Sequence, residues 1–247
     1  MPPKQRPNRV PVPGAKRRPD TRLLVALLAA AAAVTVTAIV LSVTLGGGHK
    51  TISPSTIVGS GGLLNGIPQN GLVLGNPKAK VTLTEYIDAT CPICRDYTLN
   101  TVPSIVEQYV RPGKVNMELR PVNNGWPSGE RGRDLILAAA RQNKAWQFAE
   151  LGYHNQGDEQ TAWLTDDLAR AFADKIPGLK ADTLLADANS GAVLSKAAAL
   201  DTTAQSDAVK GTPTFVLTTP DGTRHLLGAG DYPLSAFATA LDRALKA

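Results

Sequence analysis

The chain has 247 residues, which is enough for one sizeable domain and an appendage, and it carries a formal net charge of +5. The charge is uneven, because residues 1–22 hold seven Lys and Arg against one Asp. The rest of the chain keeps 19 of the 26 basic and 20 of the 21 acidic residues, a net charge of −1. A domain this close to neutral gives no support to nucleic-acid binding, so we expect no nucleic-acid partner.

The N-terminal segment has the pattern of a membrane anchor. Residues 1–22 are basic and rich in Pro, and an uncharged run follows from Leu23 to Leu45. A helix over this run would be about 34 Å long at about 1.5 Å per residue, enough to span a hydrocarbon core of about 30 Å. The alternative, a cleaved signal peptide, has a shorter apolar region that ends in small residues. We therefore expect a cytoplasmic tail at 1–22, a single transmembrane helix at 23–45 in the cell membrane, and an extracytoplasmic remainder.

Residues 46–70 are predicted to form a flexible linker. They contain two glycine-rich runs and two prolines, which favour flexibility and discourage regular structure. The folded domain is then expected to span residues 71–247.

The predicted elements of this domain alternate between strands and helices. In chain order they are strands at 72–74 and 81–87, a helix at 95–110 kinked at Pro103, a strand at 115–122, helices at 130–154, 165–175 and 181–208, strands at 216–217 and 225–227 joined by a turn at 220–222, and a helix at 234–245. This order predicts an α/β sheet with a helical subdomain inserted at about 128–208.

The only two cysteines lie together in the sequence Cys91-Pro92-Ile93-Cys94, between a predicted strand and a predicted helix. Pro92 suits the first helical position, where its missing N–H costs nothing. Cys91 then lies at the helix N-terminus, where amide dipoles favour its thiolate and lower its pKa from about 8.5. Cys94 follows one turn later on the same face, so it can attack a mixed disulfide formed by Cys91. The motif therefore predicts thiol–disulfide chemistry.

Two other roles are open to such a pair, a stabilising disulfide and half of a zinc site. A bridge that closes about four residues stabilises by only ~2 kcal/mol in the chain-entropy model, against ~4.7 for about 100 residues. The three histidines, His49, His154 and His225, lack zinc-finger spacing. We therefore favour the redox role and expect no metal and no cofactor besides the disulfide itself.

A second motif, Gly211-Thr212-Pro213-Thr214-Phe215, follows about 120 residues after the cysteines and leads into a predicted strand. A cis proline at Pro213 would lie beside the dithiol. An ordinary turn is the alternative, but the preceding Gly and the strand that follows favour a substrate groove. The backbone of Gly211, Thr212 and Pro213 could then pair with an extended peptide, and Pro92 and Ile93 are also expected to bind substrate. Substitution of Pro213 is expected to slow the release of mixed disulfides.

Together with Leu74-Gly75-Asn76-Pro77 and the strand at 81–87, these motifs make residues 71–247 similar to the DsbA-like branch of the thioredoxin superfamily. The resemblance implies a thioredoxin fold with an inserted helical domain. It also implies catalysis of disulfide exchange in exported proteins. Cys91 matches the exposed nucleophile, Cys94 the buried resolving cysteine, and Pro213 the cis proline.

The resemblance further implies a role for Glu85 and a set of partners. Glu85 matches a buried acid beneath the dithiol, and a quinone-linked membrane partner would reoxidise the enzyme. Cysteine-containing exported proteins would be its substrates. The chain departs from the family's best-known periplasmic oxidase at Ile93, where that enzyme has histidine, and this predicts a weaker oxidant.

Strand alternation supports the same placement of Glu85, because Leu83, Glu85 and Ile87 share one face. A buried acid there would have a raised pKa and could exchange a proton with Cys94. The alternative is a surface acid on an edge strand. Asp88, near the strand end, is interpreted as a turn or cap residue.

The expected function is thus extracytoplasmic thiol–disulfide exchange, most simply disulfide formation. Two alternatives stay open at this point. One is the reverse chemistry, a reductase or isomerase fed by an electron donor. The other is a tethered, non-enzymatic chaperone that uses only the peptide groove and would work without its cysteines.

Overall fold

The computed structural model describes residues 62–230 and 232–247. The predicted tail, the predicted transmembrane helix at 23–45 and the first part of the predicted linker lie outside this range. Within the described residues, none of the helices combines the length and apolar character needed to cross a bilayer.

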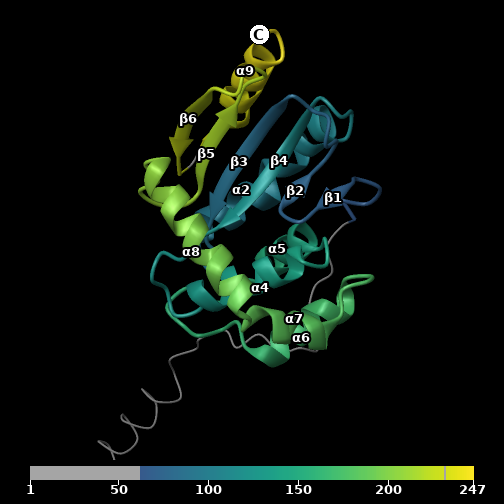
Figure 1. The fold of residues 1–247 in the computed structure, drawn as a ribbon, viewed down its shortest axis with the longest axis vertical. Coiled ribbons are helices and arrows are strands. Elements are labelled where there is room, and N and C mark those ends of the chain that lie inside the picture. Colours follow the sequence, from purple (N-terminus) through teal and green to yellow (C-terminus); the bar gives the residue numbers. More distant parts are fainter. Residues whose placement is uncertain (1–61, 231) are drawn as a thin grey trace, which may run out of the picture. The chain divides into compact units, whose positions relative to one another are not determined.

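A six-stranded sheet in the order β1-β2-β4-β3-β5-β6 forms the centre of the domain (Figure 1). β3 and β4 are parallel, in a register that pairs Glu85 with Leu119, and every other pairing is antiparallel. Because β3 and β4 are the two middle strands, the residues at their C-terminal ends meet at one edge of the sheet. The strands are β1 (Gln69–Asn70), β2 (Val73–Leu74), β3 (Val81–Ile87), β4 (Val115–Pro121), β5 (Thr214–Thr218) and β6 (Arg224–Ala229).

The folded domain begins earlier than predicted, so the linker assignment at 46–70 is wrong for residues 62–70. Leu64 and Ile67 are only 5% and 9% exposed, and β1 adds an edge strand to the sheet. The guanidinium of Arg111 donates hydrogen bonds to the carbonyls of Leu63 and Asn65. The glycines and Pro68 suggested flexibility, but burial of two apolar side chains stabilises the segment.

The segment that follows the cysteines is helical from Pro92 to Val110 but is not one continuous α-helix. It divides into α2 (Pro92–Asn100), α3 (Val102–Ile105) and a π-helical turn (Val106–Val110). The break falls at Thr101, two residues before Pro103. Proline supplies no N–H to continue the helix and crowds the preceding turn, which accounts for the predicted kink.

Between β4 and β5 the chain forms five helices, in agreement with the predicted insertion at about 128–208. They are α4 (Gly129–Ala140), α5 (Ala145–His154), α6 (Asp166–Lys175), α7 (Ala181–Ala188) and α8 (Gly191–Ser206). Thr165 caps α6 as its sequence suggests, by accepting a hydrogen bond from the amide of Leu168.

Two of the predicted helices are each divided in the structure. The predicted helix at 130–154 breaks at Asn143, which adopts a positive φ of 56°. The predicted helix at 181–208 breaks before Ser190, whose side chain caps the next helix through the amide of Val193. Asn tolerates the left-handed region and Ser favours N-caps, so both breaks use residues suited to them.

The sheet is covered on both faces (Figure 1). On one face, Tyr97 of α2 and Phe237 of α9 (Leu234–Ala244) pack against Phe215 of β5, with ring centroids 4.6 and 4.7 Å from it. On the other face, Tyr86 and Val216 cluster with Ala204 of α8. Burial on both sides explains why β3 is buried along most of its length instead of alternating with solvent.

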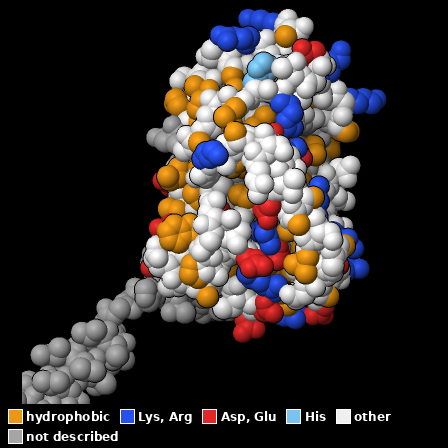
Figure 2. All heavy atoms as spheres, turned by 60° about the vertical axis from the view of Figure 1, so that its left-hand side comes forward, with side chains coloured by type: hydrophobic (Ala, Val, Ile, Leu, Met, Phe, Trp, Pro, Cys, Tyr) orange, Lys and Arg blue, Asp and Glu red, His pale blue; other side chains and the backbone are white. Residues whose placement is uncertain are grey.

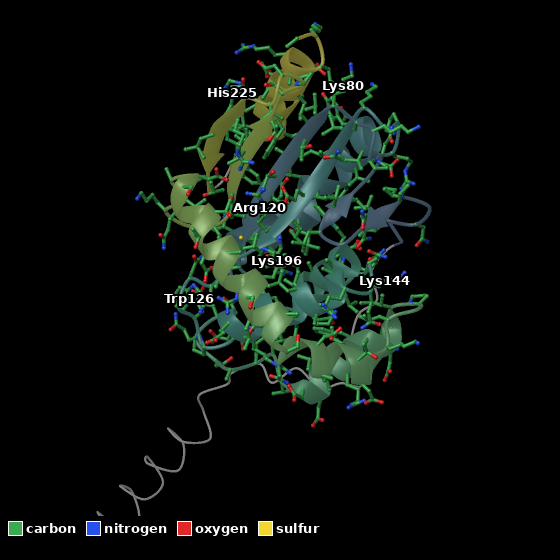
Figure 3. All side chains as sticks on the ribbon, in the orientation of Figure 1. Lys80, Arg120, Trp126, Lys144, Lys196 and His225 are labelled. Atoms are coloured by element: carbon green, nitrogen blue, oxygen red, sulfur yellow. The ribbon has the colours of Figure 1, made fainter. Side chains whose placement is uncertain are left out.

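The C-terminal end of α8 is held to the sheet by charges. Asp207, the C-cap of α8, accepts hydrogen bonds from Tyr86, Arg120 and Arg224, and Arg120 also pairs with Glu118 at 2.9 Å. Figure 3 shows Arg120 over the sheet beside α8. On the face drawn in Figure 2, acidic and basic side chains are interleaved in the lower half and form no patch of one sign.

Candidate active site

The two cysteines lie at the start of α2, directly beyond the C-terminal end of β3. Cys91 is the N-cap of the helix, and its Sγ atom accepts a hydrogen bond from the amide of Cys94 at 3.2 Å. Pro92 occupies the first helical position, as the motif predicts. Both cysteines are free thiols, so the geometry is that of the reduced protein.

Cys91 is less exposed than the resemblance implied. Its residue is 6% exposed and Cys94 is completely buried, so the description of Cys91 as an exposed nucleophile is wrong for this reduced form. The reason is the loop at 211–213, which lies against the sulfur, with the carbonyl of Thr212 accepting a hydrogen bond from Sγ at 3.3 Å. Ile93, between the two cysteines, is 47% exposed.

The environments of the two thiols displace their pKa values in opposite directions. A hydrogen bond from the Cys94 thiol is the main reason why the pKa of Cys91 falls to about 6, and Thr212 and the amides of Ile93 and Cys94 add to the effect against the cost of burial. Burial raises the pKa of Cys94 well above its usual value. Cys91 therefore ionises first, and its thiolate is the species available at neutral pH.

The loop at 211–213 is tightly organised beside Cys91. The Thr212–Pro213 peptide bond is cis, at the position where the sequence motif suggested it. The hydroxyl of Thr214 donates to the carbonyl of Gly211 at 2.7 Å, and the amide of Gly230 donates to the carbonyl of Pro213 at 2.8 Å. The backbone at Thr212 thereby faces the sulfur of Cys91.

Glu85 lies on the central strand β3 and is 1% exposed, which rules out the alternative of a surface acid on an edge strand. Burial raises its pKa to about 8, and the hydroxyl of Tyr97 opposes the shift. No donor among the described residues reaches Oε2 of Glu85 with hydrogen-bonding geometry. At pH 7 this side chain is therefore mostly a neutral carboxylic acid.

A second buried acid, Glu150 of α5, was missed by sequence reasoning. It is 8% exposed, and burial raises its pKa to about 7. Glu85 and Glu150 both line one cavity of about 10 Å³. The sequence carries no signal for this pair, because they lie 65 residues apart on a strand and on an inserted helix.

Asp88 hydrogen-bonds to the loop before Cys91 and to the loop that contains Asn124, which fits its interpretation as a turn residue. Its carboxylate accepts hydrogen bonds from the amide and hydroxyl of Thr90, at 2.8 and 2.6 Å, and from the amide of Asn124 at 2.7 Å. Its carbonyl accepts from the amide of Cys91 at 3.0 Å and from the hydroxyl of Tyr153 at 2.9 Å.

Asn124 connects the site to its third loop and was also missed by sequence reasoning. Its side-chain amide donates to the hydroxyl oxygen of Thr212 at 2.6 Å. The loops that hold Cys91, Asn124 and Thr212 are therefore linked in a chain of hydrogen bonds that passes through Asp88. The described residues contain no group of three or more His, Cys, Asp or Glu placed to hold a metal ion.

A family model described as thioredoxin matches residues 68–221 of the chain. The chain belongs to the thioredoxin family. The oxidised BdbD of Bacillus subtilis superposes with a TM-score of 0.61 over 73% of this chain and 98% of that chain, at 20% identity. A thioredoxin-like oxidoreductase from Silicibacter pomeroyi superposes with a TM-score of 0.57 over 76% of this chain and 99% of that one, at 25% identity. These findings confirm the predicted thioredoxin fold with a helical insertion.

Among curated proteins, this family member is similar to a probable disulfide bond formation protein D of Bacillus cereus. The two are 29% identical over 147 residues, which cover 57% of this chain and 66% of the relative. The chain thus spans just under two thirds of the length of that relative.

Proposed function

We propose that the protein is a thiol–disulfide oxidoreductase whose redox centre is the pair Cys91 and Cys94. The observation that carries this proposal is the position of Cys91 as the N-cap of α2, where its sulfur accepts from the amide of Cys94 and lies against the cis Thr212–Pro213 loop. These surroundings lower the pKa of Cys91 to about 6 and burial raises that of Cys94, an asymmetry that a disulfide with only a stabilising role does not need. A thiolate stabilised in the reduced form makes the oxidised form a better electron acceptor.

In the oxidative direction, a substrate thiolate attacks Sγ of Cys91 and breaks its bond to Cys94. Cys94 leaves with the electron pair and takes up a proton, because its pKa is well above neutrality. A second substrate thiolate attacks the substrate sulfur of the mixed disulfide and releases Cys91 as a stable thiolate. The substrate has lost two electrons and gained a disulfide, and the enzyme is left as a dithiol.

Glu85 is the proposed proton donor and acceptor for Cys94. It is buried on β3, which leads to the dithiol, and both it and Cys94 act on the ionisation of Tyr97. Its pKa of about 8 means that it holds a proton at pH 7 and can release it within the operating range. The hydroxyl of Tyr97 interacts with Glu85, and besides burial the charges of Glu85 and Cys94 raise the pKa of Tyr97.

Substrates are proposed to bind beside the exposed tip of α2. Ile93 and Tyr97 line an open cavity of about 320 Å³, together with Tyr232. The backbone of Thr212, between Gly211 and Pro213, lies against the sulfur of Cys91, and an extended peptide would pair with it there. Pro92 and Ile93, which are both exposed, would supply apolar contact.

The proposed setting is the outer side of the cell membrane. The uncharged run at 23–45 would anchor a single-pass protein with its N-terminus in the cytoplasm. Cysteine-containing exported proteins would be the substrates. The two-electron acceptor that restores the disulfide would be a quinone-linked membrane partner, and an electron donor would replace it if the enzyme works as a reductase or isomerase.

The first experiment is to trap substrates with Cys94→Ser. This variant lacks the thiol that would attack the mixed disulfide between Cys91 and a substrate and release the substrate. Cys91 of this variant can still attack a disulfide of an exported protein and expel one substrate thiolate, so adducts that a reductant releases should accumulate, and Cys91→Ser should give none. If exported proteins mature normally in cells whose variant has both cysteines replaced by Ser, the proposal is overturned in favour of a non-enzymatic chaperone.

The direction of electron flow is tested by acid quenching of cells followed by alkylation with a mass-shifting thiol reagent. A mostly oxidised pair identifies a disulfide donor. A mostly reduced pair identifies a reductase or isomerase.

A further inference from the structure

The hydroxyl of Thr212 is held by a residue from a loop that carries none of the motif residues. Asn124 lies between β4 and α4, and its side-chain amide donates to Oγ1 of Thr212 at 2.6 Å. A hydroxyl has one proton to give and two lone pairs to accept with. The amide proton of Asn124 occupies one of the lone pairs, so the hydroxyl proton must point elsewhere.

Thr212 is also the residue whose backbone meets the sulfur of Cys91. The Cys91 thiol is 3.3 Å from the carbonyl oxygen of Thr212, and the side chain of Thr212 is one of the groups that favour the Cys91 thiolate. When Cys91 ionises, its sulfur becomes acceptor only. A hydroxyl whose oxygen is already engaged by Asn124 is oriented to donate to it, and polarisation along the chain strengthens that bond.

Asn124 can orient the hydroxyl because its own backbone is fixed. Its amide donates to the buried carboxylate of Asp88 at 2.7 Å, and the carbonyl of Asp88 accepts from the amide of Cys91 at 3.0 Å. The loop that delivers the Asn124 side chain is therefore anchored to the loop that holds the nucleophile. Substitution of the side chain leaves this backbone anchor in place.

We propose that Asn124 is a positioning residue that aims the Thr212 hydroxyl at the Cys91 thiolate and so sets how readily Cys91 ionises and how strongly the disulfide oxidises its partners. This inference deepens the proposed function, because it concerns the same pair of cysteines. Asn124 acts through Thr212, because its hydrogen bonds among the described residues go to Asp88 and Thr212 and not to a sulfur.

The test is a double-mutant cycle between Asn124→Ala and Thr212→Val, read out as the ultraviolet absorbance of the Cys91 thiolate against pH in the reduced protein. Only Cys91 titrates near neutrality, since the pKa of Cys94 is far higher. Each single variant should weaken the ionisation of Cys91 by about tenfold to a hundredfold, the size expected for one hydrogen bond to a charged acceptor. The double variant should be no weaker than Thr212→Val alone.

The matched control is Asn123→Ala, an exposed neighbour on the same loop whose side chain accepts from the amide of Gly125 and makes no hydrogen bond to Thr212. Its ionisation curve should coincide with that of the parent protein. Thermal unfolding of every variant checks that the loop remains folded.

Three results would overturn the inference. Unchanged ionisation in Asn124→Ala, or an equal weakening by this substitution in the Thr212→Val background, would show that Asn124 does not act through the Thr212 hydroxyl. A strengthened ionisation would show that Asn124 accepts from Thr212 and draws its proton away from the sulfur. Because the titration needs no substrate, it stands or falls separately from the oxidoreductase activity, which the trapping experiment tests.

Discussion

At the scale of single residues, the site depends on how Cys91 and its neighbours share protons. Cys91 is stabilised as a thiolate by several hydrogen bonds, while Cys94 and Glu85 are kept neutral by burial. Ile93 contributes neither charge nor hydrogen bond to this arrangement, although it is 47% exposed between the two sulfurs. Position 93 is therefore free to tune the redox chemistry without disturbing the core.

Ile93→His should make the protein a stronger oxidant. A protonated imidazole beside the Cys91 thiolate stabilises the reduced form, and we expect a shift of about tenfold in the equilibrium with glutathione, which corresponds to roughly 30 mV. The measurement is the redox equilibrium of each purified variant in glutathione buffers. Ile93→Leu, which keeps the position apolar, should match the parent. An unchanged potential in Ile93→His would contradict the account of this position.

Glu85→Gln should slow the exchange steps in which Cys94 gains or loses a proton. General acid–base catalysis by a positioned carboxyl contributes about a hundredfold or more, so a loss of at least tenfold is expected. The rate of reduction of the enzyme disulfide by a dithiol peptide should also lose its pH dependence near the pKa of Glu85, about 8. Glu130→Gln, at an exposed position, serves as the control. Parent-like rates and an unaltered pH profile in Glu85→Gln would exclude the proton-transfer role.

At the scale of elements, the helical insertion packs directly on the loop that carries the cysteines. A Cβ atom added at Gly132 of α4 would lie 2.4 Å from the Cβ of Ala89, which is closer than real contacts allow. Ala89 lies between β3 and Cys91, so the close approach of α4 fixes the loop from outside the sheet. The insertion is thus part of the active-site framework as well as an addition to the fold.

Gly132→Ala should therefore destabilise the protein by about 1–3 kcal/mol, as expected for overpacking. Gly152→Ala on α5 is the matched control, because a Cβ there meets nothing within 4 Å. In a helix interior that change should stabilise by about 0.5–1 kcal/mol. The measurement is the free energy of unfolding of each variant in denaturant. Equal free energies would mean that α4 does not constrain the loop.

At the scale of the whole molecule, two buried acids couple stability to pH. Glu85 and Glu150 have folded-state pKa values of about 8 and about 7, against 4.5 for the free side chain. The folded protein therefore keeps protons that the unfolded chain releases above pH 4.5. The stabilisation is complete below that pH and is lost as the pH rises through the folded-state values.

The free energy of unfolding of the oxidised protein should accordingly fall between about pH 4.5 and pH 8. Each group contributes about 1.4 kcal/mol per pH unit within its window. Oxidised protein is required because the lowered pKa of Cys91 acts in the opposite sense in the dithiol form. Glu85→Gln and Glu150→Gln should each flatten the curve, as followed by denaturant unfolding at several pH values. A decline of equal slope in the double variant would show that other groups are responsible.

Much of this organisation can be predicted from local sequence. The N-cap position of Cys91, the first-turn Pro92, the cap at Thr165 and the inward face of Glu85 all follow from neighbouring residues. The errors arose where a distant contact outweighed local preference. Residues 62–70 were assigned to a flexible linker because they contain glycine and proline, but Leu64 and Ile67 are buried in the core.

The sequence by itself determined the chemistry of the site, because the Cys-Pro-Ile-Cys spacing places two sulfurs on one helical turn wherever that helix is found. The tertiary structure alone decided the partners of those sulfurs. Thr212 lies 121 residues from Cys91, and Asn124 lies 88 residues from Thr212. Their loops meet only because β3 pairs with β4 and β5 in the folded sheet. Burial and hydrogen bonding across that edge set the two thiol pKa values, and neither can be derived from the order of residues along the chain.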